Sequence, residues 1–228
     1  MIPELNIWEH SQALRELCYR RGLDLEPEMD CAAQGAELLA PFIKSSQNKR
    51  LKLLDVGCGG GHFYHSLKRR GLEVDYRGLD YSPSIVAVAR KAFIELGLDP
   101  QKIILGDLRD LTGFECDLAA MINVLSFNAD FREPLNRLAE TGARVLVIRD
   151  FFGPKTVITY ETDGFLDNGF NHLKGYWNEW SSPEVADCLS ALGYQANFLI
   201  DKRTQGQTEL VVNKPYRWSW LLAEKKNP

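Results

Sequence analysis

Short apolar runs alternate with segments of helical periodicity along most of this 228-residue chain. The apolar runs have the length of buried strands, and in the segments between them apolar residues recur every three or four positions. Because parallel strands need crossover helices, this alternation predicts an α/β fold with a parallel sheet. The predicted strands span residues 51–56, 73–80, 102–105, 116–124, 143–148, 196–201 and 218–224, and 208–212 is either a further short strand or part of a hairpin.

Helical segments at 8–21 and 29–44 precede the first strand and predict an N-terminal helical cap over residues 1–48. The core follows over 49–228, and the length suits one domain. Regularity breaks over about 151–182, and an irregular stretch of this length in a compact domain is typical of a lid or a binding loop. Its aromatic residues are Phe151, Phe152, Tyr160, Phe165, Phe170, Tyr176, Trp177 and Trp180.

The most informative stretch joins the first strand to the helix after it. It reads Asp55-Val56-Gly57-Cys58-Gly59-Gly60-Gly61. Glycine permits positive φ and lets a ligand lie against the main chain, and open α/β sheets bind ligands at this edge. A dinucleotide fingerprint would need glycine where His62 or Tyr64 stands, and no Gly-Lys-Ser or Gly-Lys-Thr of a phosphate loop follows.

Acidic residues follow the next two predicted strands. Asp80 ends the second strand and Asp107 follows the third. A carboxylate at the first position can accept hydrogen bonds from two neighbouring ribose hydroxyls, and one at the second from the exocyclic amine of adenine. Because the carboxyl ends of parallel strands meet at one edge, Asp55, Asp80 and Asp107 should be neighbours. The three acids predict a site for an adenosine-containing cofactor.

With this pattern the chain resembles the class I S-adenosylmethionine-dependent methyltransferases from about residue 51 to the C-terminus. The resemblance implies a seven-stranded Rossmann-like sheet with an antiparallel C-terminal strand, helices on both faces, and S-adenosylmethionine as the cofactor. It also implies roles for the residues at the strand ends. Asp55 would orient the glycine loop and the ammonium, Gly57, Cys58 and Gly59 would line the methionine part, Asp80 and Tyr81 would hold ribose and adenine, Asp107 and Leu108 would read the adenine edge, and Asn123 and Val124 would face the sulfonium.

The catalytic groups and the acceptor are less defined. His172, in the aromatic stretch, is a candidate general base, although a surface loop histidine fits that position as well. Asp150 is the second candidate. Asn123 and Asp150 make only an incomplete set of the metal ligands found in metal-dependent relatives, and the histidines lack ligand spacing, so no metal is predicted. The fourth strand lacks the Asn/Asp-Pro-Pro-aromatic ending of enzymes that methylate base amines, which argues against a nucleic-acid substrate.

Composition narrows the setting further. The formal net charge is −4, so a basic surface for nucleic acid is not expected. The N-terminus has no signal-peptide pattern, and no apolar run is long enough to span a membrane. The five cysteines are scattered without any C-x-x-C, which favours free thiols in a reducing cytoplasm. The sequence leaves the oligomeric state open.

These predictions favour a cytoplasmic methyltransferase that acts on a small-molecule acceptor. The acceptor would lie under the aromatic stretch or, alternatively, under the N-terminal helices near Trp8 and Tyr19. Two other functions stay open: a protein methyltransferase whose aromatic stretch receives a peptide, and a catalytically silent scaffold that binds the cofactor or a partner chain.

Overall fold

The computed structural model describes residues 6–46, 49–110, 112–164 and 166–226. Phe165 and residues 1–5 and 47–48 of the predicted cap lie outside the described residues. The helices are α1 (Gln12–Gly22), α2 (Asp30–Lys44), α3 (His62–Arg69), α4 (Pro83–Glu95), α5 (Arg132–Glu140) and α6 (Ser182–Ala191). The strands are β1 (Leu51–Val56), β2 (Val74–Asp80), β3 (Ile103–Leu105), β4 (Leu118–Ile122), β5 (Val145–Gly153), β6 (Tyr160–Thr162), β7 (Lys174–Tyr176), β8 (Trp180–Ser181), β9 (Tyr194–Ile200), β10 (Thr208–Val211) and β11 (Lys214–Lys225). Four short 3₁₀ turns are η1 (Ile7–His10), η2 (Pro100–Lys102), η3 (Leu108–Asp110) and η4 (Leu125–Phe127).

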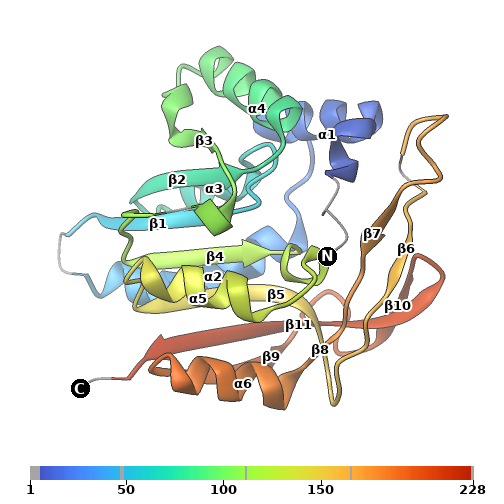
Figure 1. The fold of residues 1–228 in the computed structure, drawn as a ribbon. Helices are drawn as coiled ribbons and strands as arrows, with labels where there is room; N and C mark the ends of the chain where they lie inside the picture. The colour runs from blue at the N-terminus through green and yellow to red at the C-terminus, as the bar shows by residue number, and fades with distance from the viewer. Residues whose placement is uncertain (1–5, 47–48, 111, 165, 227–228) are drawn as a thin grey trace.

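The described residues form a sheet whose central strands follow the order β3-β2-β1-β4-β5-β11-β9 (Figure 1). Strands β1 to β5 are parallel, and β11 runs antiparallel to both of its neighbours. This confirms the predicted α/β fold with an antiparallel C-terminal strand. Two short strands extend the sheet: β10 forms a hairpin with the first residues of β11, and β8 runs parallel to the end of β5.

Both faces of the sheet are covered, as Figure 1 shows. Helices α2, α3 and α4 pack on one face, and α5 and α6 pack on the other. Consecutive strand residues therefore enter opposite layers of the core: Leu53 packs in the first and Leu54 in the second. Burial on both sides explains why the strands read as continuous apolar runs and not as alternating ones.

Several strand bounds differ from the predicted ones, and two of these differences have a clear structural reason. β5 continues to Gly153 and does not end at residue 148, because β11 runs beside it as far as Phe151 and β8 pairs with its last two residues. β4 ends at Ile122 and not at residue 124, because Asn123 has a φ of 59° and turns the chain out of the sheet.

The stretch 151–182 is more regular than its sequence predicts. β6 and β7 form an antiparallel hairpin in which Tyr160 pairs with Tyr176, and Val157 forms an isolated bridge with Glu179. The hairpin projects past the edge where the parallel strands end (Figure 1). Each of its strands has three residues, which is too short for a periodic pattern to reveal.

The N-terminal elements η1 and α1 pack over the carboxyl ends of β1 and β2. The main chain of Cys18 lies so close to Gly60 that an added Cβ would come 2.0 Å from the Cys18 carbonyl oxygen. Glu9 accepts a hydrogen bond from the Ser82 hydroxyl and one from the Ser84 backbone N–H at 3.1 Å. These contacts fix the start of the described chain above the sheet edge, where the candidate site lies.

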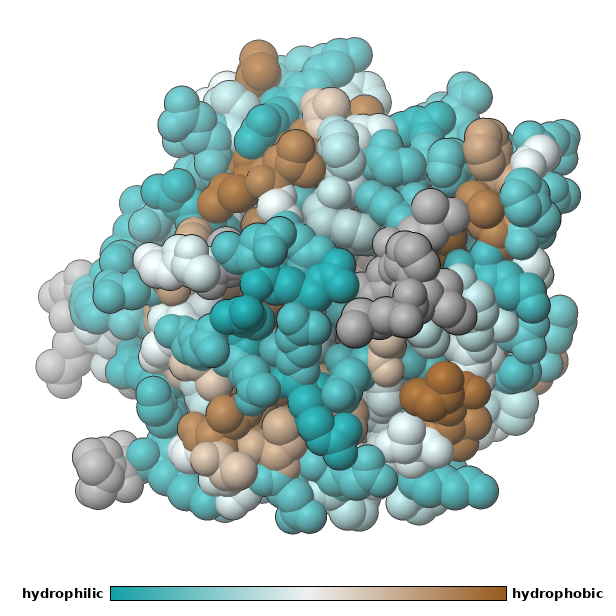
Figure 2. Space-filling view, in the orientation of Figure 1, coloured by the Kyte–Doolittle hydropathy of each residue, from teal (hydrophilic) through white to brown (hydrophobic). Residues whose placement is uncertain are grey.

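The face of the molecule in Figure 2 is mainly hydrophilic, with apolar side chains in scattered small groups. The most exposed large apolar residues, among them Leu25, Ile94, Ile200 and Leu210, belong to different parts of the chain. Scattered exposed side chains of this kind are ordinary for a protein surface. Among the described helices, none has the length and apolar character needed to cross a membrane.

Candidate active site

The glycine-rich turn leads from β1 into α3 by a path that only glycine takes easily. Gly57, Gly59 and Gly61 have φ values of 69°, 54° and 84°, where a Cβ is sterically unfavourable. A Cβ on Gly57 would also lie 2.3 Å from Cγ2 of Val124. The Gly57 N–H donates to the carbonyl of Leu79 at 2.8 Å, which ties the turn to β2. The turn therefore presents main chain, and no bulky side chain, to the space beyond the sheet.

Asp80, at the end of β2, is held by the backbone around it. Its Oδ2 accepts from the Gly59 N–H and its Oδ1 from the Ser82 N–H, each at 3.0 Å. Burial raises the pKa of Asp80, while these hydrogen bonds act in the opposite direction. Each carboxylate oxygen has a second lone pair, so Asp80 can still accept hydrogen bonds from a ligand.

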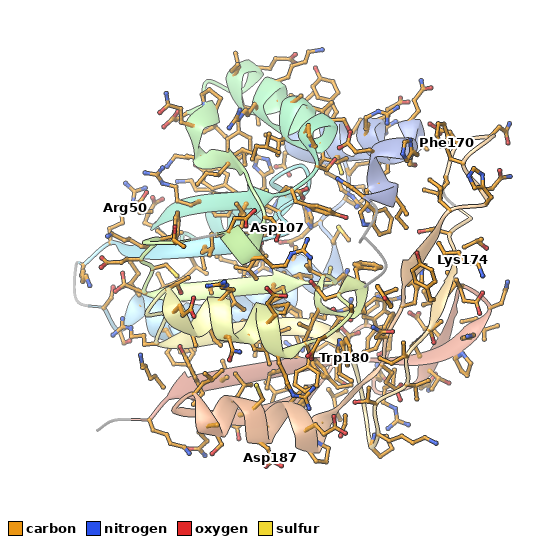
Figure 3. The ribbon with its side chains drawn as sticks, viewed as in Figure 1. Arg50, Asp107, Phe170, Lys174, Trp180 and Asp187 are labelled. Atoms are coloured by element: carbon orange, nitrogen blue, oxygen red, sulfur yellow. The ribbon has the colours of Figure 1, made fainter. Side chains whose placement is uncertain are left out.

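Asp107 lies beyond the end of β3, where Figure 3 labels it, and pairs with Arg109. Its Oδ1 accepts from the Arg109 backbone N–H at 2.9 Å, and its Oδ2 lies 2.5 Å from Nη2 of the same arginine. Burial acts to raise the pKa of Asp107, but the hydrogen bonds from Arg109 outweigh it and hold that pKa below its ordinary value. Asp107 is therefore an ionised hydrogen-bond acceptor at neutral pH.

These groups line a cavity of about 410 Å³ at the carboxyl edge of the sheet. A cavity of this volume has the size of a small-molecule site. One side of it, which we call the strand-end half, brings together most of the residues that the sequence nominated for the cofactor. They are Gly57, Gly59, Asp80, Tyr81, Asp107, Leu108, Asn123 and Val124.

Asp55 and Cys58, the other two nominated residues, do not line the cavity, because their side chains point into the protein. Asp55 is buried and accepts a hydrogen bond from the Tyr76 hydroxyl at 2.6 Å. Burial raises the pKa of Asp55 to about 7, although the Tyr76 bond opposes this. The Cys58 thiol packs beneath Gly78, where an added Cβ would lie 2.8 Å from Sγ. Burial raises the pKa of this thiol well above its ordinary value.

The opposite side of the cavity, which we call the aromatic half, combines rings from distant parts of the chain. Trp8, Phe127 and Trp177 pack edge to face. The ring centroids are 5.0 Å apart for Trp8 and Phe127 and 4.9 Å apart for Phe127 and Trp177. Lys174, labelled on β7 in Figure 3, adds a cation to the wall. The aromatic half consists of Trp8, Phe127, Tyr160, Tyr176, Trp177 and Trp218.

The two locations that the sequence offered for the acceptor form one wall. The aromatic stretch contributes Trp177 and the N-terminal region contributes Trp8, and the two rings touch. Tyr19 lies elsewhere, because its hydroxyl donates to Glu95 on α4 at 2.6 Å. Trp218 was not foreseen, since nothing in the sequence of β11 shows which of its residues reaches this edge.

Other aromatic residues of the stretch have structural roles. Trp180, labelled in Figure 3, is buried in the core and donates from Nε1 to the Leu125 carbonyl at 3.1 Å. Phe170 stacks on His10, with ring centroids 4.1 Å apart. Aromatic content alone therefore does not separate the cavity wall from ordinary packing.

The two candidate bases do not line the cavity. His172 is exposed in the turn between β6 and β7. Asp150 is fully buried in β5, where its carboxylate accepts from the backbone N–H groups of Ser126 and Phe151 at 3.0 and 2.8 Å. Burial raises the pKa of Asp150, and these bonds oppose the shift. Its geometry is that of a carboxylate that anchors the loop after β4.

Arg21 and His62, which the sequence did not single out, also line the cavity. Arg21, at the end of α1, has no ion-pair partner among the residues that the structure describes. His62 is the first residue of α3, and loss of solvation, together with the charge of Arg21, lowers its pKa to about 4. His62 is therefore neutral at physiological pH. Arg21 and His62 belong to no recognisable sequence motif. Only the fold shows that they line the cavity.

Within the part of the chain that the structure describes, no three histidine, cysteine or acidic side chains are grouped so that they could hold a metal ion. All five cysteines are free, and four of them are buried. Cys18 lines the cavity, and burial raises the pKa of its thiol to about 11. A thiol with so high a pKa is a poor nucleophile at neutral pH.

Several solved structures share this fold. Magnesium protoporphyrin IX methyltransferase from Synechocystis PCC 6803, solved with bound SAM, has a TM-score of 0.55 and 19% identity, covering 85% of this chain and 79% of that one. A S-adenosylmethionine-dependent methyltransferase from Clostridium acetobutylicum has a TM-score of 0.57 and 11% identity, covering 84% and 91%. The 1,6-didemethyltoxoflavin-N1-methyltransferase of Burkholderia thailandensis has a TM-score of 0.53 and 15% identity, covering 87% and 80%.

Residues 53–147, from β1 into β5, match the family described as methyltransferase domain. This segment contains the glycine turn and every strand end of the strand-end half. A search of curated proteins gives no significant match. This match and the shared fold support a class I S-adenosylmethionine-dependent methyltransferase. The chain is a methyltransferase, and the shape and chemistry of the cavity bear on which acceptor it methylates.

Proposed function

We propose that this methyltransferase transfers the methyl group of S-adenosylmethionine to a small molecule that binds in the aromatic half of the cavity. The observation that carries the proposal is the single cavity of about 410 Å³, in which the strand-end half and the aromatic half are continuous. Two relatives in fold are described by small-molecule names, magnesium protoporphyrin IX and 1,6-didemethyltoxoflavin, which supports the same class of acceptor.

The strand-end half fits the cofactor. The missing Cβ of Gly57 leaves room next to Val124 where the main chain can meet a ligand. Asp80 has lone pairs free for ribose hydroxyls, and Asp107 and Leu108 lie where an adenine edge would lie beyond β3. Structures of this fold that contain bound SAM or SAH support the assignment.

Arg21 completes the set of groups that the cofactor requires. The methionine part carries a carboxylate, and an arginine fork pairs with carboxylates in two parallel hydrogen bonds. Arg21 lines the cavity on the same side as the glycine turn and His62, and described residues leave its charge without a counter-ion. We assign Arg21 to that carboxylate. Asp55 would then support the turn from behind through Tyr76 and would not contact the ammonium.

The chain's contribution to the reaction is alignment and exclusion of water. S-adenosylmethionine would supply a methyl group on a sulfonium: the acceptor's lone pair forms the new bond to the methyl carbon, and the C–S bond breaks with its electron pair staying on sulfur as a neutral thioether. Holding the two partners in line is worth about 7–11 kcal/mol in favourable intramolecular systems. Neither of the two bases nominated from the sequence, His172 and Asp150, lies in the aromatic half of the described cavity. The acceptor is therefore expected to bind with its lone pair already available.

Labelled cofactor tests the proposal. The purified protein is incubated with methyl-labelled S-adenosylmethionine and a cell extract that has been separated into small-molecule and protein fractions. We expect label to enter the small-molecule fraction and to stop when Asp80→Asn removes the proposed ribose contact. Label confined to the protein fraction would favour a protein methyltransferase, and binding of S-adenosylhomocysteine without any transfer would favour a silent scaffold.

The cellular setting proposed for the enzyme is the cytoplasm. Its support is the chemistry of the five free thiols, which suits a reducing compartment. Fractionation of cells that express the chain, with detection by antibody, tests this directly.

A further inference from the structure

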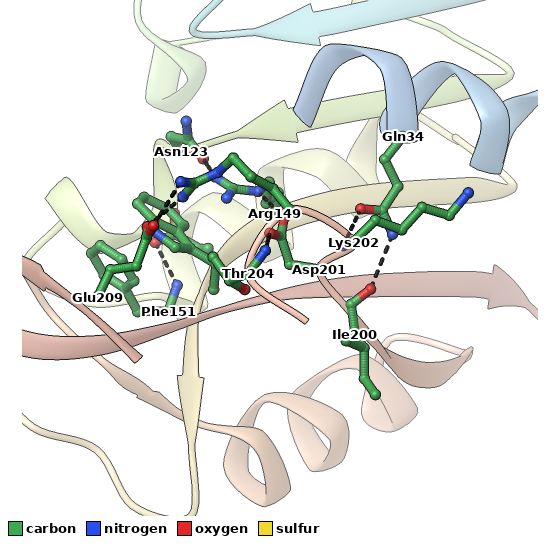
Figure 4. Close-up of polar contacts among 12 residues, drawn as sticks. Gln34, Asn123, Arg149, Phe151, Ile200, Asp201, Lys202, Thr204 and Glu209 are labelled. Carbon is green, nitrogen blue, oxygen red and sulfur yellow. Dashed lines mark hydrogen bonds and ion pairs between the residues drawn. The ribbon is translucent and has the colours of Figure 1, made fainter. Parts of the chain in front are cut away.

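A buried arginine lies behind the wall of the cavity, on the side of a second cavity that it lines together with Asn123 and Trp218. Arg149, on β5, is 2% exposed, and its guanidinium contacts three groups at once (Figure 4). Nε donates to Oδ2 of Asp201 at 2.6 Å, and Nη1 donates to Oδ1 of Asn123 at 2.5 Å. The guanidinium carbon lies 4.0 Å from the centre of the Trp218 ring. The hydrogen bonds to Asp201 and Asn123, together with the ring contact with Trp218, hold the guanidinium in one well-defined position.

Asp201 is equally fixed, so Arg149 cannot turn away from Asn123. Asp201 is 1% exposed, and its Oδ1 accepts from the Thr204 backbone N–H at 3.0 Å. Burial acts to raise the pKa of Asp201, but the hydrogen bond and charge of Arg149, together with the hydrogen bonds from Thr204, lower that pKa below its ordinary value. Asp201 is therefore ionised at neutral pH. Removing either partner would leave a buried charge, which is strongly unfavourable.

This geometry decides which end of the Asn123 amide faces the cavity. An arginine side chain has only donors, so the amide atom in contact with Arg149 has to be the oxygen. The nitrogen Nδ2 then points away from Arg149, and no described residue accepts a hydrogen bond from it. Asn123 is a residue of the strand-end half, and it lines the same cavity as Trp218 of the aromatic half. Its side chain presents two N–H donors there and no acceptor.

Among the residues that the structure describes, the aromatic half has no acidic side chain that could receive a cationic acceptor. The acidic side chains that line the cavity, Asp80 and Asp107, both belong to the strand-end half. The charged group that the aromatic half does carry is Lys174. In this cavity, an ammonium group next to Asn123 would meet N–H donors and no lone pair. An anionic oxygen at the same place would accept the hydrogen bonds that the Nδ2 N–H groups can donate.

Given the proposed function, we infer that Arg149 fixes Asn123 as a hydrogen-bond donor and that the enzyme thereby selects acceptors with an anionic oxygen at the reacting end, such as a carboxylate, a phenolate or an enolate, over cationic ammonium groups. Arg149 is a positioning residue in this scheme, and Asn123 is the group that contacts the acceptor. The same amide with its oxygen facing the cavity would favour an ammonium group, so the arginine behind the wall sets the preference.

Two probes of the same shape and opposite charge test this inference: 2-naphthoate and 2-naphthylmethylammonium. Each is titrated by calorimetry into the protein saturated with S-adenosylhomocysteine. We expect the wild-type protein to bind the naphthoate at least tenfold more tightly. Equal affinities, tighter binding of the ammonium, or no binding of the naphthoate would each overturn the inference.

Asn123→Asp is the sharpest variant, because an aspartate keeps an oxygen for Arg149 and replaces the donor by an acceptor. We expect the ratio of naphthoate to ammonium affinity to fall at least tenfold. Asn128→Asp is the matched control: Asn128 also lines the cavity but has no contact with Arg149. If both variants change the ratio equally, the effect is one of net charge and the inference is wrong.

A second variant removes the positioning group. In Arg149→Gln combined with Asp201→Asn, the buried pair is replaced by two neutral amides, and the Asn123 side chain becomes free to turn over. We expect the affinity ratio to fall several-fold while Asn123 is unchanged, and an unchanged ratio in the folded double variant would contradict the role of Arg149. Should this variant not fold, Asn123→Asp still decides.

Titration with S-adenosylhomocysteine alone separates failure of this inference from failure of the proposed function. A wild-type protein that does not bind the cofactor product overturns both. A protein that binds it, and then shows no preference for the naphthoate, retains the proposed function and loses only the assignment of the acceptor class.

Discussion

The strand-end half and the aromatic half of the cavity are built in different ways. In the strand-end half, each residue follows its own strand, and the backbone positions it: Asp80 is bonded to the N–H groups of Gly59 and Ser82. In the aromatic half, Trp8, Phe127 and Trp177 are held mainly by contact with one another. The first half depends on local geometry and hydrogen bonds, and the second depends on packing between distant segments.

This difference suits the division of work between the halves. A cofactor site serves one ligand and is fixed by backbone conformation, which changes little between side-chain substitutions. An acceptor site made of side chains on a hairpin, a 3₁₀ turn and the start of the chain can change its shape by single substitutions. We therefore expect substitutions in the two halves to affect different measurements.

The largest effect is expected for the packing of the aromatic half. Trp177→Ala removes a ring that is 6% exposed and should lower the free energy of unfolding by about 3–5 kcal/mol, as for other buried aromatic residues. Urea denaturation measures this. Affinity for S-adenosylhomocysteine should stay within about threefold, because no cofactor-binding backbone depends on the ring. Phe170→Ala, which removes a partly exposed ring of the same stretch, is the control, and a loss of cofactor affinity in Trp177→Ala would contradict the separation of the halves.

The next effect concerns the backbone of the strand-end half. Gly57→Ala places a Cβ against Val124 at a φ of 69° and should weaken binding of S-adenosylhomocysteine by at least about 100-fold, or roughly 2.7 kcal/mol. Calorimetry measures the affinity. Gly71→Ala is the matched control, since Gly71 has a φ of 62° with nothing within 4 Å of an added Cβ. Equal losses of affinity in the two variants would show that backbone strain is responsible, and not the contact of the added Cβ with Val124 in the strand-end half.

Asp80→Asn tests the carboxylate of the same half. It removes a charged acceptor from the cavity and should weaken binding of S-adenosylhomocysteine by roughly 1.5–3 kcal/mol, the usual value for hydrogen bonds to a charged group. Stability should change as well, because Asp80 is buried and binds two backbone N–H groups. Asp99→Asn is the control. Asp99 also accepts a hydrogen bond from a backbone N–H, that of Gln101, but it lies away from the cavity. Unaltered affinity in Asp80→Asn would mean that another group holds the ribose.

The buried acid behind the glycine turn should make stability depend on pH. The folded state raises the pKa of Asp55 from 3.8 to about 7, so it keeps a proton that the unfolded chain releases. This contribution is fully present below pH 4 and is lost as the pH rises to about 7, with a slope of up to about 1.4 kcal/mol per pH unit. Asp55→Asn keeps an acceptor for Tyr76 and should flatten the stability curve between about pH 4 and pH 7. Urea denaturation across that range, compared with the wild type, shows whether the difference has this sign.

The smallest effect is expected for His172. His172→Ala changes an exposed turn residue, which usually alters stability by less than about 0.5 kcal/mol. Turnover, measured with the acceptor fraction that labelling identifies, should keep its wild-type pH dependence. Loss of an activity limb near neutral pH would restore the histidine as a base and extend the catalytic groups beyond the cavity wall.

The strand-end half was largely predictable from sequence because its information is local. A strand, a turn and a helix start follow one another within a short stretch, so Gly57, Asp80, Asp107 and Asn123 could each be placed at a strand end without knowing the fold in detail. The direction of a side chain at such an end is harder to predict. Asp55 faces inward because it lies in β1, which is buried on both faces, whereas Cys58 lies in the turn, whose exact path has no sequence signal.

The sequence by itself determined the α/β architecture, the glycine turn and the acids that follow β2 and β3, because strand periodicity and positive-φ glycines act over a few residues. Only the tertiary structure decided that Trp8, Trp177 and Trp218 share one wall, that His172 and Asp150 stay away from it, and that Arg149 turns the Asn123 amide. These outcomes depend on contacts between segments that are distant in the chain, and such contacts form only when burial of apolar surface brings whole elements together.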